Sequence, residues 1–160
     1  MSNFLRWLEF LGLSIWLGSD IFLSFVVAPG AFSTLASRNE AGAIVGYSLT
    51  RMHWLGVFCG ILVLLFRLLR TRNFASLAAP AALFIALMTL LTLTSQLAVS
   101  PRMAALRLQM GSIQSTAAEG PLLAEFSRLH RISVSFESAV LLAGFTALYF
   151  FVREANPASR

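Results

Sequence analysis

Four long apolar segments constrain this chain more than any other feature of its sequence. An α-helix rises 1.5 Å per residue, so about 20 apolar residues are needed to cross about 30 Å of hydrocarbon. Residues 4–28, 52–69, 74–99 and 132–152 each approximate this length. The sequence therefore predicts an all-α, polytopic membrane protein, a four-helix transmembrane bundle that forms one domain over residues 1–160.

Composition agrees with spans that face lipid. Of the 160 residues, 58% are hydrophobic and only 12% are charged, about half the charged fraction of an average soluble domain. The net charge of +5 is the difference between twelve basic and seven acidic residues, and all twelve basic residues are arginine. Most of these arginines flank the apolar segments, which is typical of membrane orientation. We expect the lipid bilayer as a partner and no nucleic acid.

The distribution of arginine also predicts an orientation. An even number of spans places both termini on one side of the membrane, with six arginines on each side. Arg67, Arg70 and Arg72 crowd the short turn between the second and third segments, and the positive-inside rule is strongest for such short loops. The absence of lysine favours a bacterial source. We therefore expect a bacterial inner-membrane protein with both termini in the cytoplasm.

The two connections on the other side are long enough to contain short helices. Ser37 and Glu40 have the spacing of a capping box, which predicts a helix start, and the apolar residues nearby suit the membrane interface. Ser100 can cap a second short helix with Pro101 at its first position, ahead of a polar loop at 111–120. We expect both helices to be interfacial.

Prolines and small residues indicate how the spans end and pack. Pro29 is expected to end the first span, and Pro80 to kink the third near its start. Several glycines are expected to allow close approach between helices; they are Gly12, Gly18, Gly56, Gly60 and Gly144. Near the terminal side, Glu9 is expected to pair with Arg6 or Arg67.

Polar side chains gather in the half of the bundle away from the termini. Ionisable groups are costly inside a bilayer, so each is a candidate functional residue. Glu137 is predicted to be coupled to His130 or Asp20. Together these side chains predict a polar pocket on the non-cytoplasmic side; its residues are Asp20, Gln96, Glu137, Arg51 and Arg131, with His53 and His130 at its edge.

Several tracts carry a family resemblance. They include "WLGSDIFLSFVVAPGAF", "LASRNEAGAIVG", "SPRMAALR" and "FSRLHRISVSFESAVLLAG". The chain thereby resembles the transmembrane protein 205-like family, also described as domain-of-unknown-function family 4149. This resemblance implies a four-span membrane protein whose activity is mostly undefined. Glu137 stands where the family pattern leads us to expect asparagine.

Three classes of function remain open, and no substrate or ligand can be named. No phosphate loop, nucleophile elbow, zinc-protease helix or paired-cysteine site occurs in the sequence, so an enzyme is not favoured. The favoured class is a structural, assembly or interaction protein, which could form a homo-oligomer or bind a membrane-protein partner. The second is a haem b or copper-binding bundle that uses His53 and His130. The third is a small transporter that uses Asp20 and Glu137.

Overall fold

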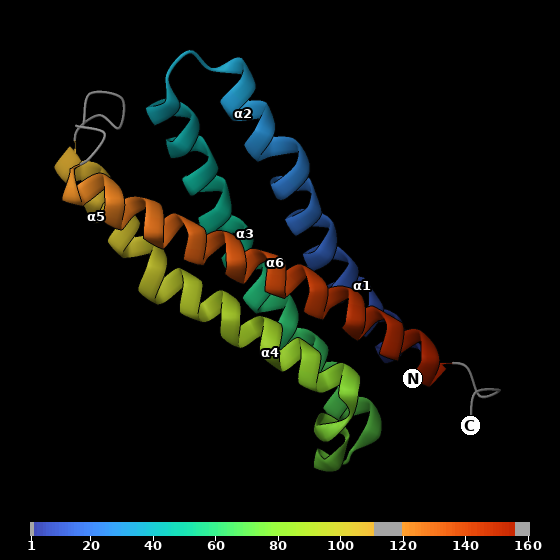
Figure 1. Ribbon diagram of the computed structural model, residues 1–160. Coiled ribbons are helices and arrows are strands. Elements are labelled where there is room, and N and C mark those ends of the chain that lie inside the picture. The colour runs from blue at the N-terminus through green and yellow to red at the C-terminus, as the bar shows by residue number, and fades with distance from the viewer. Residues whose placement is uncertain (1, 111–119, 156–160) are drawn as a thin grey trace.

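A computed structural model describes residues 2–110 and 120–155 of the chain, and all of its regular elements there are helical (Figure 1). Residues 111–119, where a polar loop was predicted, lie outside the described residues. The elements are α1 (Ser2–Phe22), η1 (Leu23–Val27), α2 (Ala28–Thr34), α3 (Arg38–Thr71), η2 (Phe74–Ala78), α4 (Pro80–Thr94), η3 (Ser95–Val99), α5 (Ser100–Met110) and α6 (Pro121–Ala155).

These elements join into four helices that are long and apolar enough to cross a membrane: Asn3–Thr34, Arg38–Thr71, Pro80–Met110 and Pro121–Ala155. The prediction of an all-α bundle of four spans is confirmed. The start of α1, the end of α6 and the η2 turn lie at one end, which we call the terminal end (Figure 1). The opposite end, called the far end, contains α2, α5 and the starts of α3 and α6.

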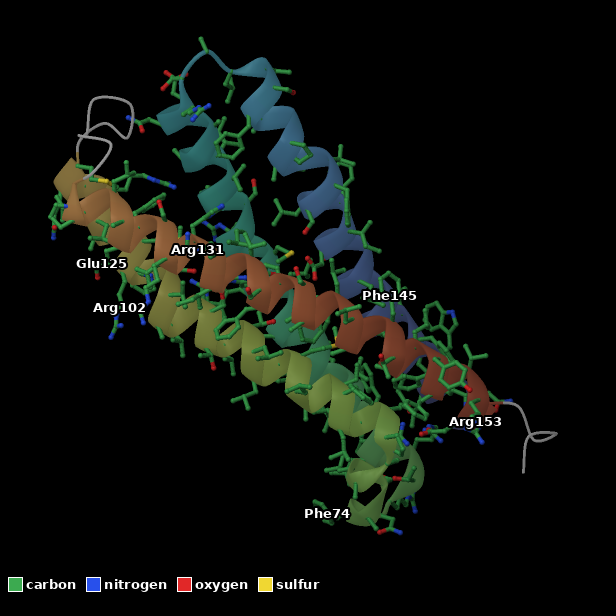
Figure 2. All side chains as sticks on the ribbon, viewed as in Figure 1. Phe74, Arg102, Glu125, Arg131, Phe145 and Arg153 are labelled. Atoms are coloured by element: carbon green, nitrogen blue, oxygen red, sulfur yellow. The ribbon has the colours of Figure 1, made fainter. Side chains whose placement is uncertain are left out.

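The most extensive contacts between helices are those of α1 with α3 and of α4 with α6. Trp16, Ile85 and Met88 are fully buried in the central core. Small residues permit this packing, because Cβ atoms at Gly56 and Gly60 would overlap Trp16 and one at Gly144 would overlap Leu17. Large apolar side chains such as Phe74 and Phe145 point away from the bundle (Figure 2), as expected for a surface that faces lipid.

Two prolines lie inside helices rather than at helix ends, contrary to the expectation for Pro29. Each follows a π-helical turn: η1 ends just before Ala28 and Pro29, and η3 just before Ser100 and Pro101. In both turns the hydrogen bond spans five residues, from the N–H of Ala28 to the Leu23 carbonyl and from that of Ser100 to the Ser95 carbonyl. The wider turn makes room for a proline ring that lacks an N–H group.

The separate interfacial helices are not confirmed. Ser37 does cap a helix, since its hydroxyl accepts a hydrogen bond from the N–H of Glu40. That helix, however, is α3, which continues through the second apolar segment for 34 residues. Likewise α5 extends α4 through η3. Pro80 does not kink the third span, because it occupies the first turn of α4, where its missing N–H costs nothing.

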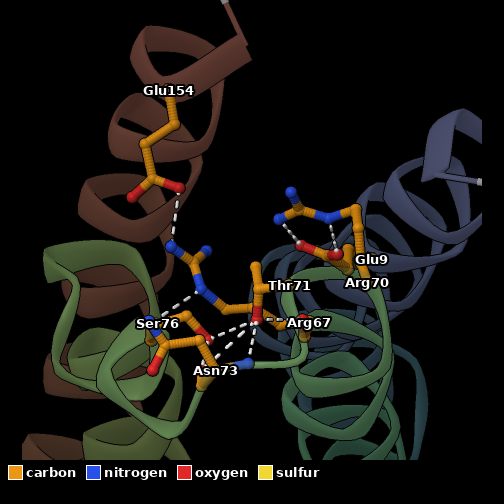
Figure 3. A network of polar contacts seen from close by, with 7 residues as sticks. All are labelled: Glu9, Arg67, Arg70, Thr71, Asn73, Ser76 and Glu154. Carbon is orange, nitrogen blue, oxygen red and sulfur yellow. Dashed lines mark hydrogen bonds and ion pairs between the residues drawn. The ribbon is translucent and has the colours of Figure 1, made fainter.

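Ion pairs tie the helices together at the terminal end (Figure 3). Glu9, fully buried on α1, accepts two hydrogen bonds from Arg70 at 2.6 and 3.1 Å. Arg67 donates to Glu154 of α6 at 2.7 Å. The expected partners of Glu9, Arg6 and Arg67, were wrong. Arg70 lies one turn beyond Arg67 on α3 and faces α1, whereas Arg67 faces α6.

Candidate functional site

His53 is the centre of a polar cluster that links three parts of the bundle. The side chain has no exposed surface. Its Nδ1 lies 2.8 Å from Oε1 of Gln96 in η3, and its Nε2 lies 2.6 Å from Oε1 of Glu137 in α6. Both ring nitrogens therefore have partners, and the second span is joined to the third and the fourth.

The hydrogen-bond chemistry of this cluster limits its charge. An amide oxygen only accepts, so Nδ1 of His53 donates to Gln96. The bond between His53 and Glu137 then contains one proton, which belongs either to the imidazole or to the carboxyl group. The pair has no net charge in either case. A neutral pair lowers the cost of placing two ionisable groups inside the membrane.

Asp20 adds a second buried acid beside this pair. It has no exposed surface, and its Oδ1 accepts a hydrogen bond from Ser24, one turn later, at 3.3 Å. Asp20 interacts electrostatically with both Glu137 and His53, whereas its Oδ2 has no hydrogen-bond partner. The cluster therefore draws on all four spans.

The two π-helical turns supply part of the cluster. Ser24 lies within η1 and Gln96 within η3. Such single turns inside longer helices occur frequently at functional sites. Here both turns lie in the far half of the bundle. The helix backbone is therefore widened at the same level at which the polar side chains of the cluster lie.

A cavity of about 890 Å³ lies next to the cluster, among η1, α2, the first half of α3, α5 and α6. Apolar side chains, including Leu23, Phe32 and Leu141, form most of its lining. Glu137 is the one carboxylate among the described residues that line it. Its Oε1 is bound by His53, but its Oε2 is buried without a hydrogen-bond partner.

Arg107 lines the same cavity close to α3. Its Nη1 donates to the Gly42 carbonyl at 2.9 Å, and its guanidinium lies 5.6 Å from the centre of the Phe126 ring. A Cβ atom at Gly42 would lie 3.1 Å from Nη2 of Arg107, so glycine gives the arginine access to the helix backbone. Arg38 is a second cation in the lining. The cavity thus combines a mainly apolar lining with arginines and a deeper carboxyl group.

Comparison with known proteins identifies a family. A family model described as "Domain of unknown function (DUF4149)" matches residues 11–112. The chain belongs to this family. The DUF4149 match contains Asp20, His53 and Gln96, whereas Glu137 lies beyond it. No curated protein and no solved structure matches the chain.

The structure brings together four of the residues that the sequence singled out in this DUF4149 protein. Gln96 and Glu137 are hydrogen-bonded to His53, and Asp20 interacts electrostatically with His53 and Glu137. The hydrogen-bonded partner of Glu137 is His53, whereas the coupling of Glu137 to His130 or Asp20 stays a prediction. His130 and Glu137 lie on the same helix, seven residues and about two turns apart. At this separation along the helix the two side chains do not meet, whereas His53 approaches Glu137 from the neighbouring helix α3.

The other predicted residues lie outside the cluster. His130 is exposed at the cavity and stacks on Phe126 with the ring centres 6.5 Å apart. Arg51 is exposed over the ring of Tyr47, 5.1 Å from its centre. Arg131 is also exposed.

Sequence reasoning missed Ser24, Ser95 and Arg107. Ser24 follows Asp20 by four residues, and this spacing places both on one helix face. Ser95 is fully buried beside Gln96, with no hydrogen-bond partner for its hydroxyl. The pair Gly42 and Gly46 was the available signal for Arg107, since small residues four apart form a groove on a helix.

The geometry gives the haem and copper hypotheses no support. Both nitrogens of His53 are hydrogen-bonded, so neither is free for axial ligation in this arrangement. His130 lies apart from it on the exposed side of α6. Across residues 2–110 and 120–155, no group of three or more His, Cys, Asp and Glu side chains could hold a metal ion.

Proposed function

We propose that this DUF4149 protein binds an amphipathic, lipid-like ligand in the cavity of its far half. One observation carries this proposal: Glu137 has one oxygen fixed by His53 and the other buried and unpartnered in a residue that lines the cavity. A buried acceptor without a partner costs about 1–3 kcal/mol. A hydrogen-bond donor on the ligand would remove that cost.

The lining indicates the class of ligand. Ligand sites are mostly apolar with a few convergent polar groups. Leu23, Phe32 and Leu141 suit a hydrocarbon body, and Glu137 suits a hydroxyl or amine group. We therefore favour a molecule with a long apolar part and one donor group, taken up from the surrounding lipid.

The proposal includes an orientation and a location. With both termini in the cytoplasm of a bacterial inner membrane, the cavity lies in the non-cytoplasmic half of the bilayer. The crowding of Arg67, Arg70 and Arg72 at the terminal end supports this orientation. The sequence tracts "WLGSDIFLSFVVAPGAF" and "FSRLHRISVSFESAVLLAG" support a likeness to the transmembrane protein 205-like proteins in particular.

A structural role is the second candidate. His53 uses both ring nitrogens to join α3, η3 and α6, an arrangement that would hold the spans in register without any ligand. In this case the cluster specifies helix packing, and the protein serves in assembly or interaction.

Photolabelling separates the two candidates. The protein in lipid nanodiscs is exposed to hexadecanol with a diazirine group in its chain, and to the matching hydrocarbon that lacks the hydroxyl. We expect the alcohol, but not the hydrocarbon, to label cavity-lining segments around Leu23–Phe32 and Met103–Arg107. Excess unlabelled hexadecanol should compete, and Glu137→Leu should abolish the difference between the two probes.

Ser135→Ala is the matched control, since Ser135 is exposed on the same helix and is not part of the cavity lining. Labelling of this variant should equal that of the wild type. Equal labelling by both probes, unchanged in Glu137→Leu, would refute ligand recognition by Glu137. If that variant also lost thermal stability, the structural candidate would be favoured.

A further inference from the structure

A second cavity lies at the terminal end, far from the polar cluster. Its volume is about 330 Å³. Three arginines, Arg6, Arg67 and Arg70, line it together with a single acid, Glu154. The site is independent of the far-end cavity and of the function proposed for it.

Arg67 is the most informative residue of this cavity. Its side chain comes from the last turns of α3, and the residue is only 4% exposed. Its Nε donates to the Ser76 carbonyl at 2.9 Å and its Nη2 to Glu154 at 2.7 Å (Figure 3). Its Nη1 is buried and has no partner. A guanidinium that is already held in place therefore has one donor group unused.

The charges around Arg67 favour an anion. Glu154 is paired with Arg67, and Glu9 with Arg70. Arg6 has no acidic partner in the described part of the chain, so one positive charge is left uncompensated among these five groups. An anion at this position would satisfy Nη1 of Arg67 and reduce the repulsion among the three arginines.

The position of the cavity identifies the kind of anion. Trp7 and Tyr149 are 55% and 61% exposed around the same end of the bundle, and exposed tryptophan and tyrosine side chains are typical of the level of the lipid headgroups. Basic pockets between spans at this level bind the phosphates of anionic lipids. We infer that the terminal-end cavity binds a phosphate group, either of an anionic lipid headgroup or as free phosphate.

The test uses the full-length protein in an uncharged maltoside detergent, with thermal stability as the readout. Dioctanoyl phosphatidylglycerol, dioctanoylglycerol and inorganic phosphate are titrated separately. We expect phosphatidylglycerol to raise Tm in a saturable way and dioctanoylglycerol, which lacks the phosphate, to have no such effect. Saturable stabilisation by inorganic phosphate as well would identify a site for free phosphate, whereas its absence would identify a headgroup site.

Arg6→Gln should weaken the apparent affinity for the stabilising probe about fivefold, and Arg6→Lys should retain most of it. Arg6 has no acidic partner to lose, so both variants should fold. Arg72→Gln is the control for charge, because Arg72 is exposed at the same end and lies outside the cavity lining. The inference is overturned if neither phosphate probe stabilises saturably, or if Arg6→Gln and Arg72→Gln weaken binding equally.

Discussion

The indole ring of Trp16 on α1 lies directly against Gly56 on α3, so close that a Cβ atom at Gly56 would overlap it. Gly60, one turn further along α3, contacts the other edge of the same ring. Trp16 is 1% exposed. The two glycines thus form the groove that seats α1 on α3.

Gly56→Ala should destabilise the protein by about 1–3 kcal/mol, because the added methyl group forces the ring or the helix to move. Gly18→Ala is a matched control, since nothing lies within 4 Å of the Cβ position at Gly18. Thermal unfolding in detergent should show a clear loss for the first variant and almost none for the second. Equal effects would contradict the close contact between α1 and α3.

Glu9→Gln should destabilise the protein by about 3 kcal/mol, because it leaves the Arg70 guanidinium without its carboxylate inside the bundle. Glu9 has no exposed surface, and the Arg70 side chain is 15% exposed. Arg72→Gln, at an exposed position of the same turn, should change stability little. A neutral effect of Glu9→Gln on thermal unfolding would show that the pair does not stabilise the terminal end.

Reporter fusions test the predicted orientation. A reporter joined after Arg160 should report the cytoplasm, and one inserted at Gly120 should report the opposite side, because Arg67, Arg70 and Arg72 retain their turn in the cytoplasm. The reverse pattern would place the far-end cavity on the cytoplasmic side.

Apolarity and helical rise were sufficient to predict the four spans and the half of the bundle in which Asp20, Gln96 and Glu137 lie. Depth along a helix follows from counting residues, but rotation about its axis depends on packing. For that reason the sequence did not indicate His53 as the hydrogen-bonded partner of Glu137. The contact with His53 depends on how α3 and α6 face each other, which sequence spacing within one helix does not report.

Local signals varied in reliability for similar reasons. Ser37 was recognised as a cap because capping depends only on nearby residues. Pro29 does not end its helix, and the sequence carries no signal for the π-helical turn that accommodates this proline. Gly56 and Gly18 look alike in sequence, but only Gly56 receives an aromatic ring from another helix.

The hydrogen bond between His53 and Glu137 links α3 to α6 at the polar cluster, and a double-mutant cycle measures it most directly. Thermal and denaturant unfolding in detergent would compare His53→Ala, Glu137→Ala and the double variant. We expect a coupling free energy of about 1–2 kcal/mol, in the upper part of the range for hydrogen bonds between spans. A parallel cycle of Glu137→Ala with His130→Ala should be additive within about 0.5 kcal/mol. Additivity in the His53 cycle, or coupling only in the His130 cycle, would contradict the polar cluster described here.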